Sequence, residues 1–75
     1  MYRIKIEELD RLGLIGNKYY AEALGITPEY VSYIKCGKFA VKTPIAKGMI
    51  SLAYGIPLSD YKIDELLEKH FTKEK

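Results

Sequence analysis

The residues best suited to polar recognition lie together in one short stretch, TPEYVSYIKCGK, at positions 27–38. Glu29, Ser32, Tyr33 and Cys36 follow one another at spacings i, i+3, i+4 and i+7, which places them on one face of an α-helix. A carboxylate, a hydroxyl and a phenol can together donate and accept several hydrogen bonds. We therefore predict an outward recognition face here, with the alternative that Tyr33 or its neighbour Tyr30 tucks back against the core.

The sequence contains few residues that could form a catalytic site. The only histidine, His70, and the only cysteine, Cys36, fall in separate predicted helices, with no evident carboxylate to orient them. Neither metal-ligand spacing nor a glycine-rich phosphate loop occurs. We expect no enzyme activity, no cofactor and no metal, and we expect a structural or incidental role for Cys36.

The charge is distributed unevenly along the chain. The formal net charge is +2, but residues 30–59 contain four lysines and no acidic residue. If the fold gathers these lysines, the protein has one positively charged face, which would suit a phosphate-rich partner. The alternative is a solvated surface that merely lacks acids. The four lysines are Lys35, Lys38, Lys42 and Lys47.

Length and composition predict one small cytoplasmic domain. Seventy-five residues suffice for a single modest core, and one cysteine allows no internal disulfide. No apolar run approaches the length of a membrane span, and glutamates follow the start too soon for a signal peptide. We expect residues 1–75 to form one domain, with residues 72–75 as a frayed tail.

Glycine and proline divide the chain into five short predicted helices, so we expect a compact all-α domain. They cover about 5–12, 17–24, 28–36 and 43–54, and a fifth follows Pro57 and carries Ile63, Leu66, Leu67, His70 and Phe71. Thr27 is the expected N-cap of the third helix and Pro28 its first residue. Residues 2–6 alternate between apolar and polar, so a short strand is an open alternative there.

The second and third helices are separated by only three residues, beginning with Gly25. A connection this short joins two helices at a wide angle, which is the geometry of the helix-turn-helix. In that motif the second helix enters the major groove of DNA and its first residues lie nearest the base edges. We therefore expect a helix-turn-helix at about 17–36.

The stretch KIEELDRLGLIGNKYYAEALGITPEYVSYIKCGK resembles the phage-repressor family, the Cro/Xre-type or lambda-repressor-like helix-turn-helix proteins. The likeness extends from about residue 5 to residue 61 and includes the later segment GIPLSDY. It implies a sequence-specific regulator of transcription, of phage or mobile-element type, that binds a double-stranded DNA operator. One departure is Gly16, which stands where the family usually has a serine or threonine cap. The residues carrying the resemblance are Ile6, Leu9, Ala21, Leu24 to Thr27, Val31, Ser32, Ile34, Gly37 and Lys38.

The resemblance implies a role for individual positions. Pro28, Glu29, Ser32 and Tyr33 match the base-reading side of the recognition helix, and Asn17 matches a residue that touches a phosphate. Glu29 suits the cytosine amino group, but an acid in a first helical turn also stabilises the helix dipole, and both roles stay open. The full set of expected DNA backbone contacts is Asn17, Lys18, Thr27, Tyr30, Lys35, Lys38 and Lys42.

Two alternatives concern partners other than DNA. Members of the family often dimerise through the last helix, so Leu67 and Phe71 are the candidate contacts of a homodimer; the simpler interpretation is that their apolar stripe completes the core. A helix-turn-helix can also carry a protein partner, as in an antitoxin or a co-regulator, with tyrosines as anchors. The lysine-rich middle favours DNA.

Overall fold

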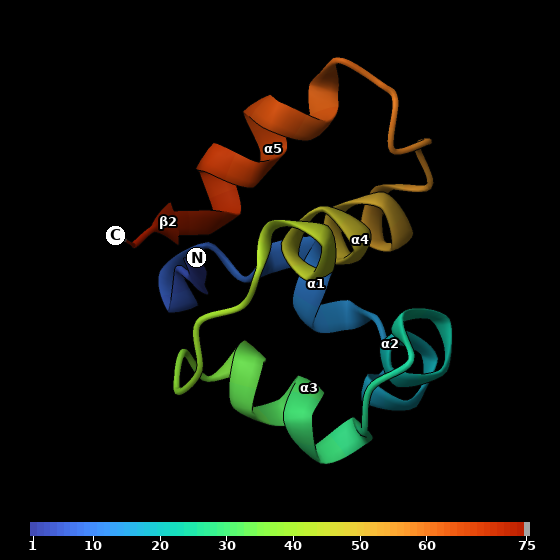
Figure 1. Cartoon of the computed structure of the whole chain (residues 1–75), viewed down its shortest axis with the longest axis vertical. Helices are drawn as coiled ribbons and strands as arrows, with labels where there is room; N and C mark the ends of the chain where they lie inside the picture. The colour runs from blue at the N-terminus through green and yellow to red at the C-terminus, as the bar shows by residue number, and fades with distance from the viewer. Residues whose placement is uncertain (75) are drawn as a thin grey trace.

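Five short α-helices make up most of residues 1–74, the part of the chain that the computed structural model describes (Figure 1). They are α1 (Asp10–Leu14), α2 (Asn17–Leu24), α3 (Pro28–Lys35), α4 (Thr43–Tyr54) and α5 (Lys62–His70). A 3-10 turn, η1 (Ile6–Glu8), precedes α1, and two short strands, β1 (Tyr2–Ile4) and β2 (Phe71–Lys73), lie at the two ends. The mainly helical prediction is confirmed. No helix within these residues is long and apolar enough to cross a membrane.

The longest helix, α4, lies in the middle and packs against α1, α2 and α5 (Figure 1). Its sequence, TPIAKGMISLAY, is the most apolar of the helices, as expected for an element covered on several sides. At Gly48, an added Cβ would lie 2.5 Å from Leu24 Cδ2, so α2 and α4 approach closely there. The glycine inside α4 is therefore explained by close helix packing.

One continuous core joins all five helices and both strands. The Cα radius of gyration is 10.9 Å, as expected of a compact chain of this size. Tyr20 is fully buried and its hydroxyl donates a hydrogen bond to the Leu12 carbonyl, 2.9 Å away. The largest fully buried side chains are Tyr20, Phe71, Leu12, Ile34, Met49, Ile50, Ile63, His70, Val31 and Val41.

The two ends of the chain form an antiparallel sheet, so the all-α prediction needs a correction. β1 pairs with β2 in the register Tyr2↔Lys73, Arg3↔Thr72 and Ile4↔Phe71. The Glu74 N–H continues the pairing by donating to the Met1 carbonyl. The predicted frayed tail is therefore wrong for residues 72–74, while residue 75 lies outside the described residues. A strand near the start was the open alternative.

The first predicted helix, 5–12, is also corrected. The chain forms the 3-10 turn η1 and then α1, which begins at Asp10 and extends beyond the expected end to Leu14. Asp10 adopts a φ of +38°, an unusual conformation for a residue other than glycine, which separates the two elements. The Lys5 N–H donates to the His70 carbonyl instead of entering a helix.

Leu67 and Phe71 belong to the core of the single chain, so their assignment to a dimer contact is corrected. Only 3% of Leu67 and 2% of Phe71 is exposed, which leaves no surface for a second copy. Phe71 lies in β2, whereas α5 ends at His70. The apolar stripe of α5 completes the core, as the simpler interpretation predicted.

Candidate nucleic-acid interface

The corner between α2 and α3 is built by local signals in the sequence. Gly25 ends α2 with a φ of +71°, which glycine adopts without the strain that a side chain would cause. Thr27 is the N-cap of α3, and its Oγ1 accepts a hydrogen bond from the Tyr30 N–H at 3.1 Å. Pro28 occupies the first turn of α3. The corner therefore forms as predicted, with α2 and α3 packed against each other.

The predicted faces of α3 are confirmed. Val31 and Ile34 are completely buried against the core. Glu29 and Ser32 are exposed, and Tyr33 keeps 39% of its surface accessible. The expected outward positions that are exposed are Pro28, Glu29, Ser32 and Tyr33 on α3 and Cys36, its C-cap. A face of this kind offers a carboxylate, a hydroxyl and a phenol to whatever lies in front of it.

Two of the four central lysines are engaged within the protein. Lys35 Nζ donates to the Ile15 carbonyl at 2.6 Å and lies 5.3 Å from the centroid of the Tyr20 ring. Burial lowers the pKa of the Lys35 ammonium. Lys47 Nζ lies 3.4 Å from the Asp64 carboxylate. The expected face of four lysines is therefore reduced, and Lys35 serves to tie the end of α3 to the α1–α2 connection.

Three other predicted cations remain exposed. Lys18 lies in the first turn of α2, and Lys38 and Lys42 lie on the segment between α3 and α4. None of the three forms a salt bridge within residues 1–74. Glu29 also has no charged partner in that part of the chain. The charges near α3 are thus available to a partner.

The ends of α2 and α4 leave backbone donors without a side-chain cap. The N-cap of α2 is Gly16, which has no side chain to offer. The N-cap of α4 is Lys42, whose side chain accepts no hydrogen bond from the helix. Asn17, which we expected as a contact at the start of α2, is the first helical residue and is half-buried. Uncapped N–H groups at a helix start attract anions such as phosphate.

An aromatic cluster, Tyr30, Tyr33 and Phe39, extends from α3 onto the loop that follows. The rings of Tyr33 and Phe39 meet edge to face with centroids 5.1 Å apart, and Tyr30 lies 5.7 Å from Phe39. Lys38 Nζ is 5.0 Å from the Tyr33 ring centroid. Phe39 was missed by the sequence analysis, because it lies outside the helical pattern that identified the other residues.

The loop after α3 is held by the terminal sheet. A strand at residues 2–6 was left open by the sequence, but neither its pairing nor its contact with this loop was predicted. Arg3 Nη1 donates to the Gly37 carbonyl at 2.7 Å, and Tyr2 exchanges two backbone hydrogen bonds of 2.7 Å with Val41. Arg3 Nε also donates to the Glu74 carboxylate at 2.6 Å, and this bond lowers the pKa of that carboxyl. The position of Lys38 and Phe39 therefore depends on the first residues of the chain.

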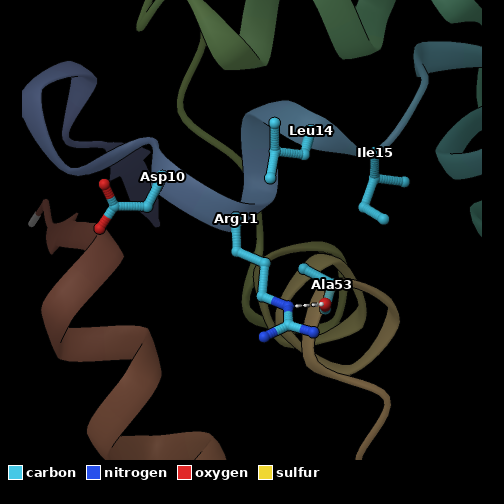
Figure 2. Close-up of a pocket in the computed structure, with 5 residues that line it drawn as sticks. All are labelled: Asp10, Arg11, Leu14, Ile15 and Ala53. Carbon is cyan, nitrogen blue, oxygen red and sulfur yellow. Dashed lines mark hydrogen bonds between the residues drawn. The ribbon is translucent and has the colours of Figure 1, made fainter.

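A shallow hollow of about 630 Å³ lies elsewhere, between α1 and the end of α4 (Figure 2). Arg11 spans it, donating from Nε to the Ala53 carbonyl at 3.0 Å and lying 5.5 Å from the Tyr54 ring centroid. Asp10, at its edge, pairs with Lys69 at 3.7 Å. Leu14 is 85% exposed beside it. Its lining residues are Asp10, Arg11, Leu14, Ile15 and Ala53.

Neither this hollow nor the α3 face contains a metal-ligating cluster: residues 1–74 hold no group of three or more His, Cys, Asp or Glu side chains that could bind an ion. Comparison with known proteins gave no match to any family model, any curated protein or any solved structure.

Proposed function

We propose that this protein is a sequence-specific, double-stranded DNA-binding regulator of the Cro/Xre helix-turn-helix type, with α3 placed in the major groove. The observation that carries the proposal is the exposed polar face of α3. Glu29, Ser32 and Tyr33 are exposed after the α2–α3 corner, and Glu29 and the two lysines on the next loop form no salt bridge within residues 1–74. A helix presented in this way fits the groove of B-DNA.

Each contacting residue then has either a positioning or a reading role. Lys18, Lys38 and Lys42 would neutralise phosphates, and the uncapped starts of α2 and α4 would add backbone N–H donors. Lys35 contributes mainly by holding α3 in place, because its ammonium is bonded to Ile15. The phosphate contacts set the orientation of α3 on the duplex.

Base reading falls to the exposed side of α3. The Glu29 carboxylate is an acceptor, and the amino group of cytosine is the base-edge donor that suits it best. Ser32 can donate or accept and so discriminates less between bases. Glu29 also lies in the first turn of α3, where a negative charge stabilises the helix dipole by about 0.3–1 kcal/mol. The substitution Glu29→Gln distinguishes the reading of a base from stabilisation of the helix.

The first experiment is a titration of generic duplex DNA at low and moderate salt. We expect micromolar affinity at about 50 mM salt that weakens steeply as salt rises. Lys38→Ala should weaken all duplexes alike and reduce the salt slope by about one unit. Lys62→Ala, which removes an equally exposed charge from α5, is the matched control and should leave the slope unchanged. Absence of binding at about 50 mM salt would contradict the proposal.

The second experiment selects binding sites from random DNA, with the unaltered chain and with Glu29→Gln. If Glu29 reads a base, the variant should prefer a different site while its overall affinity changes little. An unchanged site would assign Glu29 to the helix dipole alone. Palindromic half-sites about one DNA turn apart would indicate that the protein binds as a dimer.

The aromatic cluster favours a second candidate function, a protein-interaction module such as an antitoxin or co-regulator. Tyr33 and Phe39 are 39% and 40% exposed, and exposed aromatic rings are frequent anchors of protein interfaces. Lys38 lies beside Tyr33 without a salt bridge in residues 1–74, and this favours DNA, because phosphate satisfies a cation directly. The salt titration separates the two candidates, since a protein-only module should leave generic duplex DNA unbound.

A further inference from the structure

Resting on the proposed function, we infer that the Tyr33–Phe39 pair forms an apolar edge that reads the 5-methyl group of a thymine in the major groove. This assigns to Phe39, a loop residue outside the recognition helix, a part in specificity. The thymine methyl is the apolar group that base pairs display in the major groove, and apolar side chains, phenylalanine among them, recognise it by contact.

The geometry of the pair suits this task. Phe39 is 40% exposed and meets the Tyr33 ring edge to face at an interplanar angle of 67°. Tyr30, half-buried and packed on the core, supports Phe39 with its ring centroid 5.7 Å away. The rings of Tyr33 and Phe39 therefore present a fixed apolar surface, so little side-chain freedom is lost when a methyl group contacts it.

The surroundings of the pair point to a base rather than to an apolar peptide. Tyr33 lies one helical turn after Glu29, on the exposed face of α3. Lys38 places its ammonium 5.0 Å from the Tyr33 ring centroid without an ion pair in residues 1–74. An apolar edge directly beside a free cation matches a base methyl that is flanked by a backbone phosphate.

The test replaces each thymine of a selected duplex, one at a time, with uracil, which removes only the methyl group and keeps base pairing. At one or two positions we expect a loss of affinity of about three- to fivefold, the factor that burial of one methyl group supplies. Phe39→Ala should bind thymine and uracil duplexes equally at those positions. Tyr61→Ala, which removes an exposed ring from a distant segment, should keep the full discrimination.

The outcomes separate this inference from the proposed function. Salt-dependent binding without any effect of uracil, or a selected site that lacks thymine, overturns the thymine contact and leaves DNA binding intact. Absence of DNA binding overturns both, and would direct attention to a protein partner for the same rings. If Phe39→Ala fails to fold, Tyr33→Ala provides the same comparison, because loss of either ring removes the edge. Discrimination that persists in the folded variant also overturns the inference.

Discussion

His70 at the end of α5 is completely buried, and both of its ring nitrogens are hydrogen-bonded. Glu29 and Ser32 on α3 are exposed instead, and Glu29 forms no salt bridge within residues 1–74. Arg3 and Lys38, the cations near these two regions, also differ in whether they have partners. Arg3 at the terminal sheet bonds to both Glu74 and Gly37, while Lys38 on the loop after α3 has no acidic partner in residues 1–74.

This contrast separates polar groups that stabilise the fold from polar groups that remain for a partner. A buried polar atom must be paired, since leaving it unpaired costs about 1–3 kcal/mol. An exposed one is solvated and adds little to stability. Substitutions at His70 should therefore change stability and leave DNA binding intact, and substitutions on the outer face of α3 should do the reverse. Arg3 belongs to both groups, because it also holds the loop after α3 through the Gly37 carbonyl.

The largest effect is expected from His70→Leu. The Glu8 carbonyl accepts from His70 Nδ1, and the Tyr54 hydroxyl is hydrogen-bonded to His70 Nε2 at 2.6 Å. Leucine leaves both partners unpaired, and we expect a loss of about 2–4 kcal/mol of unfolding free energy, measured by urea denaturation. Tyr54→Phe removes only one bond and should cost about 1 kcal/mol. A His70→Leu protein as stable as the original would break the contrast.

A smaller effect is expected from Thr27→Ala at the start of α3. The Thr27 Oγ1 caps the helix by accepting from the Tyr30 N–H, and loss of such a cap costs about 1 kcal/mol. Thr27→Ser keeps the hydroxyl and is the matched control. Thermal or urea denaturation should rank the three proteins accordingly. Equal stability of the alanine and serine variants would show that the cap does not hold α3.

The helices next to this cap were predictable from the sequence because their signals are local. Gly25, Gly37 and Gly55 each take a positive φ at or just after a helix end, and Thr27 with Pro28 begins the next helix within two residues. These signals act through neighbouring backbone atoms, so the corner and its outward face could be read directly. α4 begins at Thr43 as expected, although its N-cap is Lys42.

Most of the missed features depend on residues distant in the sequence. Lys35 reaches Ile15, and Lys47 reaches Asp64, so charge counting along the chain could not show which lysines stay free. The terminal sheet joins residues 2–4 with 71–73, and neither strand is long enough to give a clear alternating pattern. Phe39 gains its importance only from the Tyr33 ring beside it.

The next prediction concerns acid stability at the terminal sheet. The bond from Arg3 lowers the pKa of the Glu74 carboxyl below its ordinary value. The contribution of the Arg3–Glu74 pair to stability is therefore complete above the pKa of the carboxyl in the unfolded chain, about 4.3. It is lost as pH falls through the lower pKa of that carboxyl in the folded protein. In urea denaturation between about pH 2 and 7, Glu74→Gln should lose less stability on acidification than the original chain. Parallel curves would contradict an interaction between the two side chains.

The smallest effect is expected from Gly16→Ser at the start of α2. Gly16 has φ −65° and ψ 146°, which any residue adopts, and an added Cβ meets nothing within 4 Å. Serine would supply the missing cap and should raise the free energy of unfolding by roughly a few tenths of a kcal/mol. Gly25→Ser, at φ +71°, is the matched control and should lower stability. If Gly16→Ser destabilises the protein, the N-cap geometry is not as described.

The terminal sheet also has a consequence for the order in which the chain folds. Among the described elements β1 is synthesised first and β2 last, so β1 has no strand partner until synthesis reaches residue 73. The α2–α3 corner relies on local contacts and can form much earlier. The Arg3 and Tyr2 contacts that fix the loop after α3 would then be the final step of folding. Opening of the two ends should in turn be the first step of unfolding, and would free that loop while α2 and α3 stay packed.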